Sequence, residues 1–216
     1  MPKRANRKDY SGQHPLLGSS QDTRLRIIGG TWRGRQIRYS GDPVTRPMKD
    51  NIRESVFNLI GGWIPGKLVI DLFAGTGAIG LEALSRGAVH AILVERHFAT
   101  AKLIEQNVRD LDATSQTTVV MSDTFFWSRQ FLKQSPPASP PWAIFCSPPY
   151  SLYAERADDM LELIRSLWEA APPASVFVVE ADARFDSNSL PDPDSWRVRE
   201  YNPAIIHVWR PHVVDP

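Results

Sequence analysis

The sequence lacks the features that mark several classes of protein. Its 216 residues include one cysteine, Cys146, which excludes an internal disulfide and a zinc site built on several thiolates. No apolar run approaches the ~18 residues that span a membrane, and residues 1–15 lack the apolar segment of a signal peptide. The histidines are scattered without the spacing of metal ligands. We therefore expect a cytoplasmic protein without a metal or a membrane partner, acting as a monomer.

Neither sign of charge dominates the whole chain, but its two parts differ. Residues 1–53 carry 12 Lys and Arg against 4 Asp and Glu, whereas residues 54–216 carry 13 against 20. A basic N-terminal part on an acidic body suggests an arm that binds a polyanion, although a solubilising tail explains the charge equally well. Residues 1–23 are polar and without periodicity, which predicts a disordered basic tail.

Residues 24–49 are expected to form a small extension ahead of the main domain, residues 50–216. The stretch 24–39 predicts two short strands, because glycines mark turns within it. Asp50 is expected to cap a helix that ends at Gly61-Gly62.

From residue 67 onward, predicted strands and helices alternate. Strands are expected over 67–73, 91–95, 117–121, 142–146 and 175–181. Helices are expected over 77–86, 98–110 and 154–170, and another follows the strand 117–121 and ends at about residue 133. The C-terminal part predicts an antiparallel pair of strands around Asn202-Pro203. Repeated strand–helix units indicate an α/β fold, a parallel sheet between two layers of helices, with ligands at the carboxyl ends of the strands.

A glycine-rich loop, "DLFAGTGAIG", stands between the first of these strands and its helix. Gly75, Gly77 and Gly80 follow the G-x-G-x-x-G spacing, which lets a ligand approach the backbone at a helix N-terminus. Glu95 ends the next strand, 20 residues after Gly75, where a carboxylate can accept hydrogen bonds from both hydroxyls of a ribose. Loop and acid together predict a ligand that contains adenosine.

Two further carboxylates narrow the choice of ligand. Asp71 lies four residues before Gly75, where it would repel the pyrophosphate of a dinucleotide. It would suit a positively charged amino group, such as that of S-adenosylmethionine. Asp123 follows the third strand and could accept from the adenine amino group or, nearly as well, cap the next helix.

With "SPPY" at 147–150, the glycine loop resembles that of the class I S-adenosylmethionine-dependent methyltransferases. The stretches "RIIGGTWRGRQI" and "TRPMKDNIRESVFNLI" are similar to the RsmD-like 16S ribosomal RNA guanine-N2 methyltransferases, and the likeness covers about residues 24–150. It implies a Rossmann-like seven-stranded sheet with an antiparallel C-terminal hairpin, S-adenosyl-L-methionine as cofactor, and 16S rRNA or the small ribosomal subunit as partner. The cofactor-binding positions that it implies, with their neighbours, are Asp71, Phe73, Ala74, Gly75, Thr76, Gly77, Glu95, Arg96, Asp123 and Thr124.

The same resemblance assigns the catalytic positions to Ser147, Pro148, Pro149 and Tyr150. An exocyclic amine is a poor nucleophile, so its two N–H groups must be held and its lone pair aimed at the methyl group. The Ser147 hydroxyl and the Pro148 carbonyl would accept these N–H groups, and Tyr150 would stack on the base, extruded from its helix. The expected RNA contacts in the extension are Arg26, Trp32, Arg33, Arg35, Arg38 and Arg46.

Ser147 departs from the family, which has Asp or Asn at this position. A hydroxyl accepts a hydrogen bond without supplying charge, and "SPPY" also resembles some cytosine-N4 methyltransferases of DNA. Three functions therefore stay open: methylation of guanine N2 in 16S rRNA, amino methylation of cytosine N4 or adenine N6 in DNA or RNA, and a catalytically weak RNA-binding assembly factor. Trp32 could instead form the core of the hairpin, and Arg46, Arg53 and Glu54 could form an ion-pair network that pins the N-terminal helix to the sheet.

Overall fold

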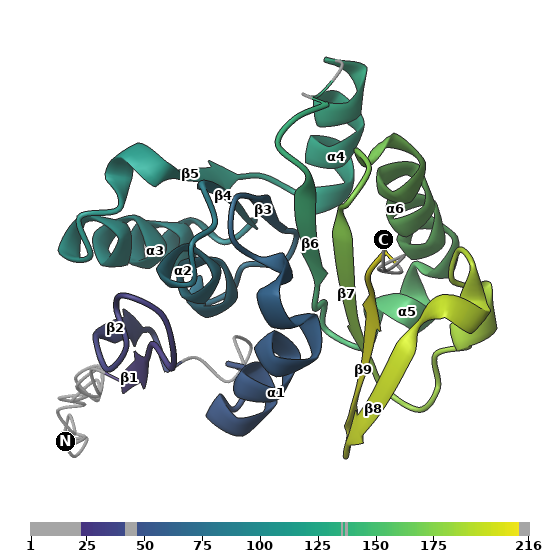
Figure 1. The fold of residues 1–216 in the computed structure, drawn as a ribbon, viewed down its shortest axis with the longest axis horizontal. Coiled ribbons are helices and arrows are strands. Elements are labelled where there is room, and N and C mark those ends of the chain that lie inside the picture. Colours follow the sequence, from purple (N-terminus) through teal and green to yellow (C-terminus); the bar gives the residue numbers. More distant parts are fainter. Residues whose placement is uncertain (1–22, 42–46, 135, 137, 212–216) are drawn as a thin grey trace, which may run out of the picture.

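A seven-stranded sheet forms the centre of the computed structural model, which describes residues 23–41, 47–134, 136 and 138–211. Its strand order is β5-β4-β3-β6-β7-β9-β8, and β9 runs antiparallel between β7 and β8 while the other neighbours are parallel (Figure 1). This is the predicted mostly parallel sheet with an antiparallel C-terminal hairpin. The strands are β3 (Leu68–Asp71), β4 (His90–Glu95), β5 (Thr117–Met121), β6 (Trp142–Cys146), β7 (Val176–Ala181), β8 (Arg197–Tyr201) and β9 (Ala204–Trp209).

Helices cover both faces of this sheet and give the predicted three layers. Successive strand residues point to opposite faces, so along β3 Val69 joins one apolar core, whereas Leu68 and Ile70 join the other. The first core packs against α1 (Asp50–Ile60), α2 (Ala78–Ser85) and α3 (Phe98–Asp110), the second against α4 (Thr124–Lys133) and α6 (Ala157–Ala170). No helix among the described residues has both the length and the apolar character needed to cross a membrane.

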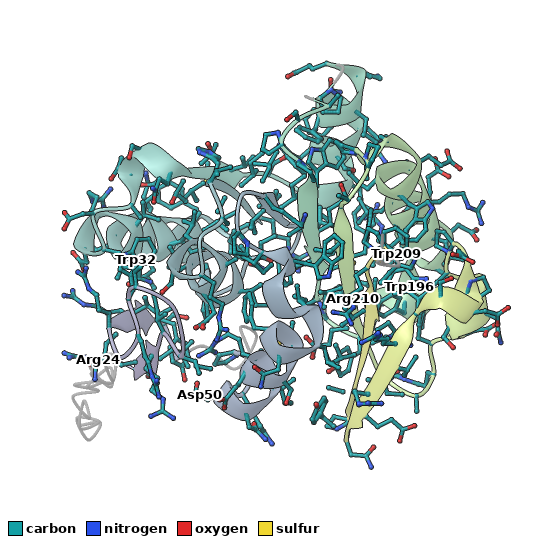
Figure 2. All side chains as sticks on the ribbon, in the orientation of Figure 1. Arg24, Trp32, Asp50, Trp196, Trp209 and Arg210 are labelled. Carbon is teal, nitrogen blue, oxygen red and sulfur yellow. The ribbon has the colours of Figure 1, made fainter. Side chains whose placement is uncertain are left out.

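Aromatic rings attach α6 to the C-terminal hairpin. The Trp168 ring lies 4.3 Å from that of Trp209 and 5.7 Å from that of Trp196, between centroids. Figure 2 labels Trp196 and Trp209, which lie together beside the C-terminal strands. This cluster fixes the edge of the sheet that lies beyond β7.

Two details of the helices differ from the sequence prediction. Asp50 does not cap α1; it is the first helical residue, Lys49 precedes it without a side-chain cap, and its carboxylate instead pairs with Arg26 and Arg53. The single helix predicted over 154–170 is two helices, α5 (Leu152–Glu155) and α6. Arg156 separates them with a non-helical φ of −138°, and its guanidinium contacts Asp159 and the ring of Phe125.

The predicted N-terminal hairpin is present as β1 (Thr23–Arg26) and β2 (Gln36–Tyr39), and it packs against α2 and α3 (Figure 1). The buried Glu82 of α2 accepts hydrogen bonds from the backbone N–H groups of Ile28 and Gly29, both at 2.7 Å. Asn107 of α3 exchanges two hydrogen bonds with the backbone of Arg38. The hairpin is therefore held by its backbone, which leaves many of its side chains exposed.

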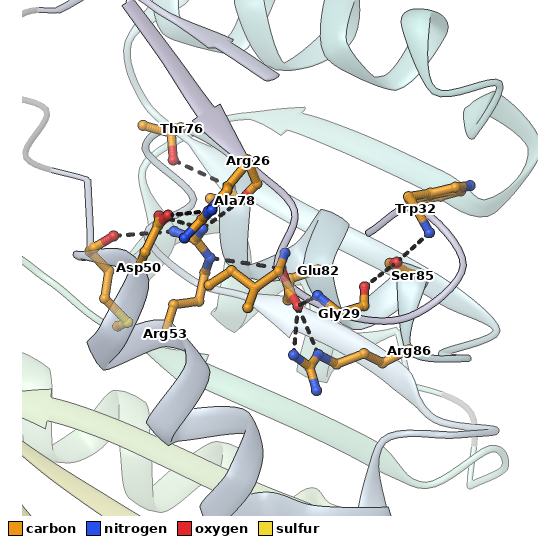
Figure 3. Close-up of polar contacts among 12 residues, drawn as sticks. Arg26, Gly29, Trp32, Asp50, Arg53, Thr76, Ala78, Glu82, Ser85 and Arg86 are labelled. Atoms are coloured by element: carbon orange, nitrogen blue, oxygen red, sulfur yellow. Dashed lines mark hydrogen bonds and ion pairs between the residues drawn. The ribbon is translucent and has the colours of Figure 1, made fainter. Parts of the chain in front are cut away.

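Arg53 of α1 completes this attachment from a fully buried position. Its guanidinium donates to the Arg26 carbonyl at 2.7 Å and lies 3.0 Å from the Asp50 carboxylate and 3.8 Å from that of Glu82 (Figure 3). A buried charge is tolerated when it is paired and hydrogen-bonded. Arg53 is thus an ion-paired anchor, but it ties α1 to α2 and to the N-terminal hairpin rather than, as was predicted, to the seven-stranded sheet.

Candidate active site

An open cavity of about 660 Å³ lies at the carboxyl ends of the central strands. It has two parts, which we call the glycine half (residues 73–76, 95–96 and 123–124) and the proline half (residues 147–150 and Glu180). The sheet brings them together because β3, which leads into the glycine loop, pairs with both β4 and β6. The predicted residues that line the cavity are Phe73, Ala74, Gly75, Thr76, Glu95, Arg96, Asp123, Thr124, Ser147, Pro148, Pro149 and Tyr150.

The glycines of the loop are required by close contacts. Gly77 precedes α2 with a φ of +75°, and a Cβ there would lie 3.1 Å from Ile104. A Cβ on Gly80 would lie 2.1 Å from the side chain of Leu93, so only glycine lets α2 approach β4 this closely. Gly77 itself does not line the cavity; it shapes the loop that does.

Glu95 is oriented by two backbone groups at the floor of the glycine half. One carboxylate oxygen accepts from the N–H of Gly75 at 2.9 Å, and the other accepts from the N–H of His97 at 2.8 Å. Each oxygen keeps a second lone pair. The carboxylate is therefore held in place with capacity to accept from a ligand's hydroxyl groups.

Asp71 lies beneath the loop and is almost fully buried. Neither of its carboxylate oxygens has a hydrogen-bond partner among the described residues. Burial raises the pKa of Asp71 to about 7; the N–H groups of Gly80 and Phe73, which face it outside hydrogen-bond geometry, lower it by less. A cationic ligand group would restore the charged form.

Unpartnered polar atoms gather at this end of the sheet. Six buried side-chain nitrogen or oxygen atoms of the described residues lack a hydrogen-bond partner. Four of them belong to three predicted site residues: both oxygens of Asp71, Oγ1 of Thr124 and Oγ of Ser147. Because buried polar groups are normally paired, this concentration fits a site whose ligand supplies the missing partners, as S-adenosylmethionine would.

The SPPY turn leaves the Pro148 carbonyl available. The Pro149 carbonyl accepts from Leu152 and that of Tyr150 accepts from Tyr153, both in the turn that begins α5. None of the hydrogen bonds among the described residues ends on the Pro148 carbonyl. Ser147 lines the cavity, although its Oγ is shielded from water and unpaired.

Asp123 caps the next helix, which was the second of the two roles predicted for it. One oxygen accepts from the N–H of Phe126 and caps α4, while the other lies 3.7 Å from Arg156. Its carboxylate still borders the cavity, so contact with an adenine stays a prediction.

Sequence reasoning missed several residues of the cavity wall. Glu180 lies in the proline half, where its Oε1 accepts from the Tyr150 hydroxyl at 2.7 Å. It follows an apolar run as Glu95 does, and that pattern could have indicated it. Arg156 and the β8–β9 turn also line the cavity; no local signal in their sequence marks them.

The predicted RNA-binding residues lie on the hairpin, and several already have protein partners. Arg26 pairs with Asp50 at 2.9 Å, and Arg38 lies 3.7 Å from Asp110, whose backbone carbonyl accepts from Arg35. Their contact with RNA stays a prediction, and Arg46 lies outside the described residues, as does the predicted tail up to residue 22.

Trp32 is half-buried against the core under the hairpin, and its backbone N–H donates to Ser85 Oγ at 2.8 Å (Figure 3). This position matches the interpretation of Trp32 as a hairpin core residue. It leaves part of the ring exposed, and a stacking contact with RNA stays a prediction.

The fold is that of methyltransferases. A solved structure from Escherichia coli, assigned as the methyltransferase yhhF, has a TM-score of 0.67 and 27% sequence identity, and the match covers 86% of this chain and 97% of that one. The chain belongs to the family described as Conserved hypothetical protein 95, whose model matches residues 25–209. That match extends well beyond the motifs of residues 24–150.

Relatives in this family carry a common name. Ribosomal RNA small subunit methyltransferase D of Escherichia coli is 39% identical over 133 residues, 62% of each chain. The protein of the same name from Haemophilus influenzae is 31% identical over 185 residues, which cover 84% of this chain and 90% of the relative. The chain spans only 54% to 62% of the length of the first relatives that it matches.

Proposed function

We propose that the protein methylates the exocyclic N2 amine of a guanine in small-subunit (16S) ribosomal RNA with S-adenosyl-L-methionine. The observation that carries the proposal is the group of four unpartnered polar atoms on Asp71, Thr124 and Ser147 at the end of the sheet where the cavity lies, which Thr124 and Ser147 line. The choice of substrate follows the relatives named ribosomal RNA small subunit methyltransferase D.

The glycine half would hold the cofactor. Asp71 would pair with the amino group of the cofactor, and Glu95 would accept from its ribose hydroxyls. The cofactor would lie against the backbone of the loop around Gly75. Asp123 and Thr124 border the position expected for adenine. Bound S-adenosylmethionine supplies an electrophilic methyl group.

The proline half would hold the target base. The Pro148 carbonyl, free of partners among the described residues, accepts one N–H of the amine, and Ser147 accepts the other. Pro149 fixes the direction of that carbonyl because its ring restricts the backbone. Tyr150 would stack on the extruded base, a contact worth roughly 1–3 kcal/mol.

The N-terminal extension, residues 24–49, would bind the RNA backbone. Arg33 and Arg35 are exposed on the hairpin, and Arg38 of the same hairpin lies beside the loop that carries Gly75 and Thr76 in the glycine half. Phosphate contacts of this kind position an RNA without reading its sequence. A ribosomal RNA substrate agrees with the cytoplasmic location expected from the sequence.

Transfer of labelled methyl groups to small subunits from a strain that lacks the modifying enzyme tests this function. We expect incorporation at one nucleotide, identified as N2-methylguanosine by mass spectrometry of digested RNA. N4-methylcytidine or N6-methyladenosine in the digest would favour the second function. No incorporation despite measurable cofactor binding would favour the assembly factor.

A further inference from the structure

Glu180 is a carboxylate of the cavity that the proposed cofactor site does not use. It stands near the end of β7, partly exposed, and lines the proline half together with Ser147. Its Oε1 accepts from the Tyr150 hydroxyl at 2.7 Å. Within the described part of the chain, no group donates to Oε2. One oxygen is therefore fixed, and the other is available to a ligand.

The strand register places Glu180 beside Ser147. Strands β6 and β7 are parallel neighbours with Cys146 opposite Val179, so Ser147 and Glu180 are the next pair along. Cys146 and Val179 point into the core on the α6 side. Alternation then directs Ser147 and Glu180 to the other face of the sheet, where the cavity lies.

Ser147 and Glu180 differ in the charge of their side chains. The Ser147 hydroxyl is neutral and its Oγ is shielded from water, whereas Glu180 is a partly exposed carboxylate. A hydrogen bond to an ionised acceptor is roughly twice as strong as one between neutral groups. An amine that becomes a nucleophile gains positive charge, so a carboxylate beside it favours the reaction.

We propose that Glu180 is a catalytic residue of the acceptor site: Oε2 accepts an N–H of the target base and supplies the charge that Ser147 lacks, while Oε1 orients Tyr150. This inference rests on the proposed function and sharpens its choice of base. Guanine presents an N1–H beside its N2 amine, and Oε2 can accept this N1–H while Ser147 and the Pro148 carbonyl hold the amine. Adenine and cytosine present a ring-nitrogen lone pair beside their amine, which a carboxylate repels.

Four variants separate the charge of Glu180 from its contact with Tyr150. They are Glu180→Ala, Tyr150→Phe, Ser147→Asp, and Glu180→Ala combined with Ser147→Asp, with Glu162→Ala as control because Glu162 is an exposed carboxylate of α6 away from the cavity. Transfer to unmodified small subunits is measured at saturating cofactor, and cofactor affinity is measured by calorimetry. Glu180→Gln serves if Glu180→Ala does not fold.

We expect Glu180→Ala to lower kcat about 100-fold and Tyr150→Phe no more than about 10-fold, with cofactor affinity unchanged within about twofold. Ser147→Asp should recover about 10-fold in the Glu180→Ala background and give no gain in the wild type. A loss no larger than that of Tyr150→Phe, or no recovery by Ser147→Asp, would overturn the inference. Absence of transfer by the wild type would contradict the proposed function itself.

Discussion

The two halves of the cavity differ in how the chain builds them. The glycine half comes from one loop and the ends of β4 and β5, and its key carboxylate, Glu95, is oriented by two backbone N–H groups. The proline half joins one turn to a residue of another strand, through the hydrogen bond between Tyr150 and Glu180. The first half is thus a local structure, whereas the second depends on the pairing of β6 with β7.

Because the two halves are built by different segments, we expect cofactor binding and base recognition to respond separately to substitution. A change in the glycine half should alter cofactor affinity and leave the contact with RNA intact. A change in the proline half should alter the rate and leave cofactor affinity intact. A single substitution that changes both cofactor affinity and the rate would contradict the separate roles of the two halves.

The largest expected effect concerns Asp71, whose pKa is raised by burial to about 7 from an ordinary value of 3.8. Because the folded state holds this proton and the unfolded state releases it above pH 4, the free energy of unfolding should fall as pH rises from about 4 to 7. The fall should reach about 4 kcal/mol. Denaturant titrations over this range should show the slope in the wild type and its loss in Asp71→Asn.

Below pH 7, cofactor binding should also release a proton from Asp71, which calorimetry in buffers of different ionisation enthalpy detects. Asp182→Asn is the matched control, since the hydrogen bond from Arg184 lowers the pKa of Asp182, the opposite direction to Asp71. An unfolding free energy that rises between pH 4 and 7, and does so equally in Asp71→Asn, would contradict the burial of an uncompensated carboxyl group.

Glu95→Ala should lower the affinity for S-adenosylmethionine by at least about 100-fold. The carboxylate would give up two hydrogen bonds to the ribose, each worth about 1.5–3 kcal/mol when one partner is charged. Calorimetry measures the affinity, with Glu105→Ala on the outer side of α3 as control. Retention of wild-type affinity in Glu95→Ala would place the cofactor elsewhere.

Ser147→Ala should lower kcat about 10-fold with unchanged cofactor affinity, because one neutral acceptor is lost while the Pro148 carbonyl stays. Single-turnover transfer to unmodified small subunits measures this rate. Ser151→Ala, an exposed serine in the same turn, is the control and should keep the wild-type rate. A Ser147→Ala protein as fast as the wild type would remove Ser147 from the acceptor site.

The smallest effect is expected on the hairpin. Replacing Arg33 and Arg35 with alanine should weaken binding of small subunits about threefold to tenfold. It should also reduce the salt slope, which is the slope of log affinity against log salt concentration, by about one to two, because each phosphate contact contributes to that slope. Filter binding at several salt concentrations measures both. Arg165→Ala on α6 should change neither, and an unchanged salt slope in the hairpin variant would exclude the hairpin as an RNA contact.

The glycine half could be predicted from sequence because its signals are local. The loop, the helix after it and the acid at the end of the next strand follow one another within 25 residues, 71–95. The strands of the sheet could be predicted for the same reason, since each apolar run is bounded by polar or glycine residues.

The rest could not be predicted because it depends on contacts between distant segments. Glu180 becomes a neighbour of Tyr150 only when β7 pairs with β6. Asp50 has the residue type of a helix cap, but pairing with Arg26 and Arg53 uses its carboxylate instead. Arg156, at the break between α5 and α6, likewise contacts Phe125 of another helix, which periodicity does not reveal.

A crystal structure with bound S-adenosylhomocysteine tests the central claim most directly. We predict that the ribose hydroxyls contact Glu95, that the amino group reaches Asp71, and that the thioether sulfur faces the Pro148 carbonyl across the cavity. A ligand bound outside the cavity, or one whose sulfur points away from Ser147, Pro148 and Glu180, would contradict the account.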